Sequence, residues 1–339
     1  ANTNNNMKLA VILATLAAVA QAKLNRPRSE YEAKFVDHVN KHGLEFESGA
    51  EFSKRLSIFA SNSDLIEQHN AGDSTYTLGH NQFSHLSFEE FQEMYLSEPV
   101  PRKEGSRYVN AFEGVVADDA VDWVGSGYVT DVKNQGSCGS CWSFSTTGGL
   151  EGAYFAKTGT TVSFSEQMLV SCDRRGNGGS DMGCNGGLMD NAYQWIAKNG
   201  LCTEDDYPYT SGTGTRGSCD SSCTPVDGTV GITYTDVAND ETSLAAAVSQ
   251  QPISVAVDAD THWQLYKSGI MTDVSGTQLD HGVLAVGYGT DSGSNFWKIK
   301  NSWGADWGED GYIRISKDVD QTNGPCGITS GPPSYPTLA

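Results

Sequence analysis

The sequence predicts an α+β fold, in which a body of two halves that meet at a cleft is preceded by a separate helical segment. Up to about residue 96 the chain is charged, helical in pattern and free of cysteine, whereas from residue 117 onward it is rich in Gly, Trp and Cys. In this second part helical patterns come first and strand patterns follow, an order typical of α+β domains. A chain of 339 residues is long enough for two compact units.

The elements of the N-terminal part follow from spacing and capping signals. Within residues 51–70, four apolar residues recur at near-helical intervals, which predicts a long amphipathic helix. Residues 76–79 predict a short strand and turn, and Ser87 predicts the capped start of a short helix. From residue 97 to 116 the periodicity fades among prolines, glycines and scattered charge, which predicts a linker open to cleavage.

The second part begins with two predicted helices, at residues 143–157 and 188–198. Strand-like alternation punctuated by Gly follows at residues 253–257, 282–288 and 295–299. No internal repeat is present, so we expect one body rather than an array of units.

Charge and targeting signals limit the partners. The formal charge of -20, from 22 basic and 42 acidic residues, leaves no basic stripe for phosphates, so neither nucleic acid nor an anionic membrane is expected as a partner. A signal peptide is predicted over residues 1–22, with cleavage after Ala22. Residues 7–22 hold one lysine, then an apolar run, and then a small-residue end, which is the pattern of such a peptide. A membrane anchor is the alternative, but the run is well below the ~20 residues that cross a bilayer. Residues 1–6 precede Met7 and resemble a non-native extension.

The most informative segment contains two cysteines three residues apart, Cys138 and Cys141, in QGSCGSCWSF. A zinc site would need a second ligand pair at similar spacing, and a redox motif would need a short βαβ context, and neither is present. In the third interpretation Cys141 opens a helix, where backbone N–H groups and the helix dipole stabilise a thiolate and lower its pKa. Such a thiolate is a strong nucleophile.

A cysteine nucleophile needs an imidazole base and an acceptor that orients the imidazole. Five of the seven histidines lie in the first third of the chain, which leaves His262 and His281. His281 stands at the head of an apolar strand, and Asn301 can accept a hydrogen bond from one of its ring nitrogens. Either residue alone has a structural explanation, as a packed histidine or a turn asparagine. Their combination with Cys141 favours catalysis.

These segments resemble the papain and cathepsin L family of cysteine peptidases, over residues 29–91 and 121–336. The resemblance implies two subdomains, a mainly helical left half and a β-barrel-like right half, with an active-site cleft between them. It also implies a helical inhibitory prosegment over residues 23–116, ahead of a peptidase domain over residues 117–339.

By this resemblance Cys141 is the nucleophile, His281 the general base and later acid, and Asn301 the residue that fixes the imidazole. Gln135 would donate its side-chain amide to the oxyanion, together with the backbone N–H of Cys141. Trp303 would cover the hydrogen bond between His281 and Asn301 from water.

Further residues are implied to bind substrate. The glycines Gly186 and Gly187 would let a substrate strand approach the backbone without a Cβ in the way, with a plain turn as the alternative. The pocket for the side chain two residues before the scissile bond would be lined by Met189, Ala256, Leu279, Gly282 and Gly331. Because these residues are apolar or small, with no carboxylate at Gly331, we expect a preference for Leu or Phe there and poor acceptance of Arg.

The inhibitory prosegment pattern of the family falls on one helix, at Glu51, Arg55, Phe59, Asn62, Ile66 and Asn70. A second element, Gly79-x-Asn81-x-Phe83-x-His85, departs from the family, which has Asp where this chain has His85. An imidazole gains charge as the pH falls, whereas a carboxylate loses it, so we expect a modified activation profile. The prosegment would block the cleft until the linker is cut, with a new N-terminus at residues 116–119.

All eight cysteines lie between Cys138 and Cys326, as expected of an oxidised extracytoplasmic domain. The resemblance implies the pair Cys138–Cys184, a bond of Cys172 with Cys219 or Cys223, and a bond of the remaining one with Cys202. Cys326 lacks its family partner and is expected to be a free thiol. No motif requires a metal or a cofactor.

The predicted function is that of a cysteine endopeptidase made as a zymogen, acting on protein or peptide substrates, with its own prosegment as intramolecular inhibitor. We expect a monomer of the secretory pathway, in the lysosome or vacuole or outside the cell.

A catalytically silent binding protein is the main alternative to an enzyme. It is disfavoured because all four catalytic residue types are present. A protease inhibitor is argued against by the intact C-terminal domain. A ligase or an exopeptidase stays open, although no inserted loop with paired histidines favours the latter.

Overall fold

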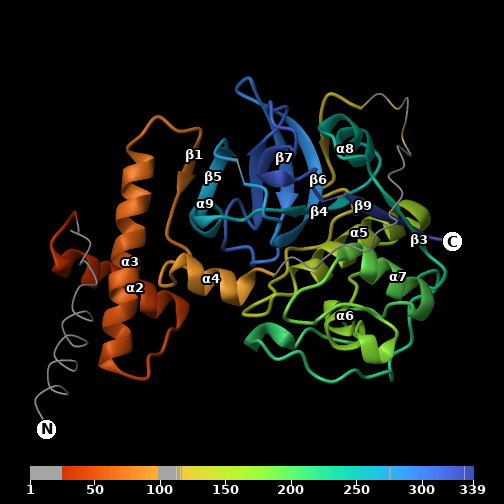
Figure 1. Ribbon diagram of the computed structural model, residues 1–339, viewed down its shortest axis with the longest axis horizontal. Coiled ribbons are helices and arrows are strands. Elements are labelled where there is room, and N and C mark those ends of the chain that lie inside the picture. Colours follow the sequence, from red (N-terminus) through yellow and green to blue (C-terminus); the bar gives the residue numbers. More distant parts are fainter. Residues whose placement is uncertain (1–24, 98–111, 113–114, 116, 275, 332) are drawn as a thin grey trace, which may run out of the picture.

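The computed structural model describes residues 25–97, 112, 115, 117–274, 276–331 and 333–339. The predicted signal peptide, and the predicted linker apart from residues 97, 112 and 115, lie outside the described residues. Figure 1 shows two long helices beside a body that combines a sheet with a group of helices, which is the predicted α+β arrangement. In the part of the chain that the structure describes, no helix is both long and apolar enough to cross a membrane.

The N-terminal segment, residues 25–97, is built on two packed helices, α2 (Arg28–His42) and α3 (Gly49–Asn70). Ser48 caps α3 by accepting a hydrogen bond from the backbone N–H of Glu51 at 3.2 Å. The two helices share a small core of their own, made of Tyr31, Phe35, Leu56, Phe59 and Ala60. Because this core is separate from that of the body, the helices stand to one side of it in Figure 1.

From α3 the N-terminal segment runs onto the body. Strand β1 (Tyr76–Leu78) pairs antiparallel with β5 (Tyr266–Met271) and so extends the sheet of the body. Helix α4 (Phe88–Tyr95) begins with a capping box, in which Ser87 Oγ accepts from the N–H of Glu90 and the Glu90 carboxylate accepts from the N–H of Ser87. In Figure 1 α4 leads from the long helices to the junction of the sheet and the helical group.

One half of the body is helical. Its elements are α5 (Cys141–Thr158), α6 (Glu166–Cys172), α7 (Met189–Asn199) and the short 3₁₀ turns η1 (Arg175–Asn177) and η2 (Ser211–Thr213). Its core contains the fully buried side chains of Trp142, Leu150, Phe164, Leu169, Tyr193 and Ile196. Three disulfides cross-link this half: Cys138–Cys184, Cys172–Cys219 and Cys202–Cys223. Closing these loops restricts the unfolded chain and so stabilises the folded one.

The other half is built on a sheet with the order β1-β5-β8-β7-β6-β4-β9-β3, and β2 pairs with β6 outside this path. Its other strands are β2 (Val121–Asp122), β3 (Thr233–Asp236), β4 (Ile253–Val257), β6 (His281–Asp291), β7 (Ser294–Lys300), β8 (Tyr312–Ser316) and β9 (Ser334–Thr337). The short helices α8 (Glu241–Val248), α9 (Thr261–Leu265) and η3 (Pro325–Gly327) belong to the same half. Cys326, within η3, is buried and unpaired.

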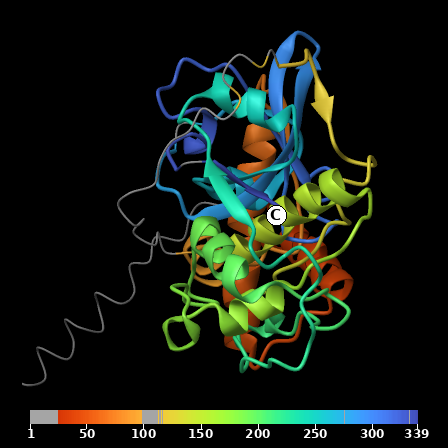
Figure 2. The ribbon, with the colours of Figure 1, turned by 90° about the vertical axis from the view of Figure 1, so that its right-hand side faces the viewer.

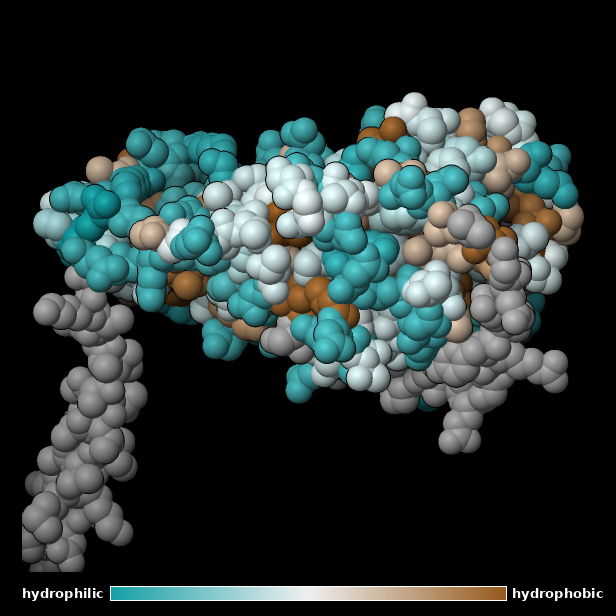
Figure 3. Space-filling model, turned by 90° about the horizontal axis from the view of Figure 1, so that it is seen from above, coloured by the Kyte–Doolittle hydropathy of each residue, from teal (hydrophilic) through white to brown (hydrophobic). Residues whose placement is uncertain are grey.

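The two halves are stacked in the view of Figure 2, with the sheet above and α5 to α7 below. The face seen in Figure 3 is mostly hydrophilic, and its apolar residues form small separate patches. The visible face therefore offers no broad apolar surface.

The predicted helices and strands are all present, and most have shifted ends, although β4 has the predicted ends. The helix predicted at residues 143–157 begins at Cys141, and the strand predicted at 282–288 extends over His281–Asp291. Strands β2, β3, β5, β8 and β9 were not predicted, because short strands gain their stability from partners in the sheet rather than from a pattern of their own.

Candidate active site

Cys141 is the first residue of α5, at the junction of the two halves. Ser140 is the N-cap, so the N–H groups of the first helical turn, which lack intrahelical acceptors, lie at the start of the helix beside Cys141. Strand β6 packs directly on this turn, since a Cβ on Gly282 would lie 3.1 Å from the Cα of Trp142 and 3.3 Å from the carbonyl carbon of Cys141. A side chain at this position would be tighter against the backbone of α5 than ordinary van der Waals contact, which favours glycine here. This close packing places His281, the neighbour of Gly282, beside the start of α5.

His281 and Asn301 form a buried pair. The distance from His281 Nε2 to Asn301 Oδ1 is 2.7 Å, and the same oxygen accepts the N–H of Ser302 at 2.8 Å, so Nε2 is the donor. The ring of Trp303 stacks on the imidazole with centroids 4.5 Å apart and excludes water from it. Among the described residues, Nδ1 of His281 has no hydrogen-bond partner, which leaves this nitrogen for a proton from outside the pair.

Burial keeps both titratable groups uncharged. It raises the pKa of the Cys141 thiol, although the backbone N–H of Gly282 opposes this effect. It also lowers the pKa of His281 to about 4, in spite of the hydrogen bond to Asn301. The sequence led us to expect a lowered pKa at Cys141. The direction is the opposite here, because the N-terminal segment covers the thiol and removes it from water.

The end of the N-terminal segment lies on Cys141. Ser97 Oγ is 3.2 Å from Cys141 Sγ and donates to the carbonyl of Gly139 at 3.1 Å. The backbone N–H of Ser97 donates to the carbonyl of Asp280 at 2.8 Å. Because Gly139 precedes α5 and Asp280 precedes β6, this residue is tied to both halves of the body.

Gln135 is hydrogen-bonded at each of its polar atoms. Its backbone N–H donates to the carbonyl of Ser302 at 2.9 Å, and the hydroxyl of Ser302 donates to its Oε1 at 2.7 Å. Its Nε2 donates to the carbonyls of Cys138 and Tyr95, both at 2.8 Å. Its own carbonyl accepts from the hydroxyl of Tyr209 at 2.8 Å. The amide predicted to bind an oxyanion is therefore occupied by a carbonyl of the N-terminal segment, that of Tyr95.

The paired glycines Gly186 and Gly187 lie against α5. Gly186 has a φ of +115°, which favours glycine, and a Cβ on Gly187 would lie 2.5 Å from the ring of Trp142. The neighbouring Asn185 bridges to Gly139 just before α5. The backbone of this loop is therefore held close to the start of α5.

The residues predicted to line the side-chain pocket surround Ala256. Ala256 stands opposite Gly282 in the pairing of β4 with β6. A Cβ on Gly331 would lie 3.8 Å from the Cβ of Ala256. The same Cβ on Gly331 would lie 2.7 Å from Leu279 Cδ1. Ala256 also packs against the apolar cluster that contains Met189. These side chains are apolar or small and lie near one another, and the pocket itself stays a prediction.

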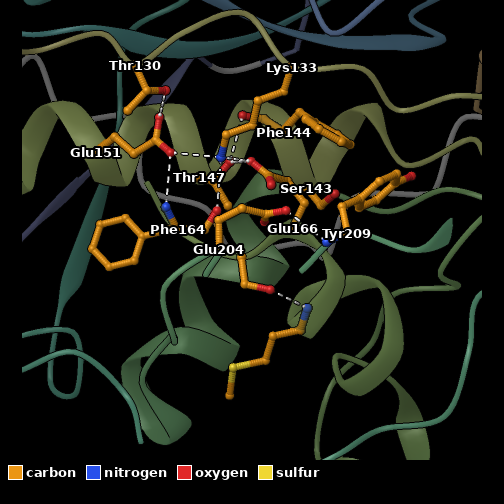
Figure 4. Close-up of polar contacts among 12 residues, drawn as sticks. Thr130, Lys133, Ser143, Phe144, Thr147, Glu151, Phe164, Glu166, Glu204 and Tyr209 are labelled. Carbon is orange, nitrogen blue, oxygen red and sulfur yellow. Dashed lines mark hydrogen bonds and ion pairs between the residues drawn. The ribbon is translucent and has the colours of Figure 1, made fainter. Parts of the chain in front are cut away.

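A buried ion network lies beside α5 (Figure 4). Lys133 Nζ lies 3.1 Å from Glu151 Oε1 and 2.7 Å from Glu166 Oε1. Burial favours a raised pKa for Glu151, but Lys133 and Lys300 outweigh it, so the pKa of Glu151 is lowered. Since Lys300 precedes Asn301, the network joins the helical half to the strand that positions Asn301. No sequence pattern predicted this network, because its charged residues are far apart along the chain.

The polar residues predicted on α3 tie this helix to the loop before α4. Arg55 Nη1 lies 2.5 Å from Glu90 Oε2, within the capping box of α4. Asn62 donates to two carbonyls of the loop at 3.0 and 3.1 Å. Asn70 exchanges two hydrogen bonds with the backbone of Leu78, at 2.8 and 3.0 Å.

His85 lies in a group of histidines on α2 and the same loop. Its Nδ1 is 3.4 Å from Nε2 of His38, whose ring centroid is 4.6 Å from that of His42. Burial lowers the pKa of His38 to about 3 and that of His85 to about 4, and the charge of Arg55 adds to the effect on His85. An imidazole in this position is therefore uncharged until the solution is distinctly acidic.

Aromatic rings of the N-terminal segment cover Trp303. Phe83 and Phe91 meet its ring edge-on, with centroids 5.6 and 5.1 Å away. Gln82 Nε2 donates to its carbonyl at 2.7 Å. The segment thus packs on the residue that itself shields His281.

Two family models match the chain. Residues 117–336 match the model described as papain family cysteine protease, and residues 35–91 match the cathepsin propeptide inhibitor domain. The chain belongs to the papain family of cysteine proteases. Its N-terminal segment is the inhibitory prosegment of a proenzyme, and its body is a cysteine-type peptidase whose disulfides are those of a secretory-pathway protein.

Solved papain-family proenzymes share the whole arrangement. The recombinant stem bromelain precursor superposes with a TM-score of 0.82 at 36% identity, covering 91% of this chain and 99% of that chain. Procathepsin L 3 of the Tenebrio molitor larval midgut gives a TM-score of 0.77 at 37% identity, with the same coverage of 91% and 99%. The papain-like fold with its proregion is therefore established.

Plant members of the papain family are similar over most of the chain. The senescence-specific cysteine protease SAG39 of Oryza sativa subsp. japonica is 41% identical over 342 residues, which cover 97% of this chain and 98% of that protein. Cysteine proteinase RD21A of Arabidopsis thaliana is 42% identical over 314 residues, which cover 91% of this chain. The matched part spans 66% of the length of RD21A.

The structure brings together Cys141, His281, Asn301 and Gln135, which the sequence singled out. It adds Tyr95 and Ser97 of the prosegment and Tyr209 of the body, which sequence reasoning missed. The contact of Tyr209 with Gln135 joins residues 74 positions apart, and neither residue lies in a periodic pattern that could have shown it.

Proposed function

We propose that the mature enzyme is an endopeptidase that hydrolyses peptide bonds with four residues: Cys141, His281, Asn301 and Gln135. One observation carries the proposal, namely the position of the prosegment end. Ser97 Oγ lies 3.2 Å from Cys141 Sγ, while the carbonyl of Tyr95 accepts the Gln135 amide at 2.8 Å. A substrate chain that takes the place of the prosegment end would present its own carbonyl oxygen to the Gln135 amide.

In the proposed reaction the Cys141 thiol passes its proton to Nδ1 of His281, and the sulfur attacks the substrate carbonyl carbon. Asn301 accepts the Nε2–H and holds the ring so that Nδ1 is free for this proton. The carbonyl oxygen becomes an oxyanion, which the Gln135 amide and the backbone N–H of Cys141 stabilise. The imidazolium protonates the leaving amine as the C–N bond breaks. Water, deprotonated by His281, then releases the acyl group from sulfur and restores the thiol.

Activation is proposed to change the charges of Cys141 and His281 and also to open the site to substrate. In the proenzyme, burial holds Cys141 and His281 in their neutral forms. Removal of the prosegment readmits water, so the thiolate at the helix start and the imidazolium become the favoured forms. We place the cut at residues 116–119, after a signal peptide at 1–22 and a prosegment at 23–116.

The second residue before the scissile bond is proposed to be hydrophobic. Leu279, Ala256 and Gly331 lie close together, and none of the three carries a carboxylate that could pair with an arginine. A peptide with Phe at this position should be hydrolysed with a kcat/KM about 10 to 100 times that of its Arg counterpart, the range expected when a hydrophobic pocket must accept a charge. Equal values for the two peptides would contradict the proposal.

The test of the function is hydrolysis of a fluorogenic Phe-Arg peptide at pH about 5 after acid incubation. Cys141→Ala and a thiol-alkylating epoxide should each abolish both hydrolysis and self-processing. Cys326→Ala is the matched control, because Cys326 is the other buried free thiol among the described residues, and it should keep both activities. A processed but inert wild-type protein would instead support the binding-protein alternative.

A further inference from the structure

Tyr209 contacts both loops that hold the catalytic groups, and the mechanism above gives it no role. Its hydroxyl donates to the carbonyl of Gln135 at 2.8 Å and lies 2.8 Å from Ser140 Oγ. A tyrosine hydroxyl has one hydrogen, and here the carbonyl takes it, so the Ser140 hydroxyl is the donor in the second bond. Two hydrogen bonds therefore run from the N-cap of α5, next to Cys141, through Tyr209 to Gln135.

Tyr209 is itself firmly held. Its backbone N–H donates to Glu204 Oε1 at 2.8 Å, and its ring meets that of Phe144 on α5 at a centroid distance of 5.0 Å (Figure 4). The next two backbone N–H groups donate to Gln167 Oε1 at 2.7 and 2.9 Å. Burial raises the pKa of the Tyr209 hydroxyl, so it keeps its proton and stays a donor.

The loop that carries Gln135 packs on the residues that follow Tyr209. The N–H of Ser137 donates to the carbonyl of Gly212 at 2.8 Å. A Cβ on Gly136 would lie 2.3 Å from the same carbonyl oxygen, so the two backbones are in direct contact. Once the prosegment leaves, the Tyr95 carbonyl no longer holds the Gln135 amide, and the contact with Tyr209 is among those that remain.

We propose that Tyr209 is a positioning residue for the oxyanion donor, which fixes the main chain of Gln135 relative to the start of α5 through its hydroxyl. The Gln135 amide and the N–H of Cys141 can then point at one oxygen atom. The inference rests on the proposed function of Gln135. Because the oxyanion exists only along the reaction path, a displaced donor lowers kcat rather than raising KM.

The test is Tyr209→Phe in the processed enzyme, with active sites titrated by a thiol-alkylating epoxide so that rates refer to competent molecules. We expect kcat for a Phe-Arg amide to fall about five- to tenfold with KM within about twofold, because the hydroxyl that links Gln135 to Ser140 through two neutral hydrogen bonds is lost. Tyr207→Phe is the matched control. The Tyr207 hydroxyl bonds to the backbone of Ser218 and Asp220, away from Gln135, and its loss should leave kcat unchanged.

A double-mutant comparison separates positioning from a general structural effect. Since Tyr209 acts through Gln135, Tyr209→Phe should cause no further loss of kcat in Gln135→Ala enzyme. An equal loss in both backgrounds, or a wild-type kcat in Tyr209→Phe, would overturn the inference. An unchanged kcat in Gln135→Ala alone would overturn the proposed function of Gln135 and the inference with it.

A second variant covers the case in which Tyr209→Phe does not fold. Ser140→Ala removes the first of the two hydrogen bonds and leaves the tyrosine in place. A smaller fall in kcat, about two- to fivefold, is expected, and again no further loss in the Gln135→Ala background. Additive losses here would also overturn the inference.

Discussion

Acid should open the prosegment through the buried imidazoles of His38 and His85, and replacing both should lower the pH at which it opens. His38 is only 6% exposed, and its Nε2 lies 3.4 Å from Nδ1 of His85. Apart from Glu90, the groups that face these two histidines are cationic or neutral. In addition to burial, His42 and Lys41 lower the pKa of His38, and Arg55 lowers the pKa of His85. A proton added to this pair therefore meets burial and like charge.

The size of the effect follows from the pKa values. Burial lowers the pKa of His38 to about 3 and that of His85 to about 4, below the ordinary 6.5. The stabilisation is thus complete above about pH 6.5 and is lost as the pH falls toward these values. Between pH 7 and 4.5 the loss is about 2 kcal/mol for each histidine. About 4 kcal/mol is a large share of the roughly 5–15 kcal/mol that stabilises a domain.

The assay uses the Cys141→Ala proenzyme, which should not cut itself, with a trace of processed enzyme added from pH 7 to 4. The fraction cleaved after a fixed time gives the midpoint of opening. A His38→Gln, His85→Gln variant should resist cleavage at pH 7 like its parent and open about one pH unit lower. His85→Asp should also shift the midpoint, since a carboxylate loses charge where an imidazole gains it. Unchanged midpoints in both variants would refute the reasoning.

Three further changes have expected outcomes. Glu90→Gln removes the partner of Arg55 at 2.5 Å and should lower the free energy of unfolding of the prosegment by about 1–2 kcal/mol in urea at pH 7. Because the pKa of Glu90 is lowered from its ordinary 4.5, this effect should decrease as the pH falls below 4.5 and through the lowered pKa. Lys133→Met removes the ammonium group that pairs with Glu151 and Glu166 and should lower the free energy of unfolding of the body by about 3–5 kcal/mol, whereas the exposed Lys157→Met should change it little. Similar urea midpoints for the two variants would contradict this. Gly331→Ala places a methyl group 2.7 Å from Leu279 Cδ1. For a peptide with Phe two residues before the scissile bond, this change should lower kcat/KM about tenfold, and for the peptide with Val at that position it should lower kcat/KM less. An equal effect on both peptides would argue against a pocket there.

The fold was largely predictable because its signals are local. The spacing of apolar residues predicted α3, the capping serine predicted α4, and Gly-punctuated alternation predicted β4, β6 and β7. Cys141, His281 and Asn301 were identified from their residue types and motifs. Strands such as β5 and β9 were missed, because their partners, not their own sequences, give them stability.

By itself the sequence determined which residues carry reactive groups, where the main helices and strands run, and that an apolar run and a helical segment precede a cysteine-rich body. Only the tertiary structure decided the environment of those groups. The pKa of Cys141 is raised rather than lowered, because the end of the prosegment removes the thiol from water. Likewise the partners of Gln135, from Tyr95 to Tyr209, come from distant parts of the chain. Burial sets the charge of these groups, and long-range contacts set their positions. Neither can be read from a short stretch of residues.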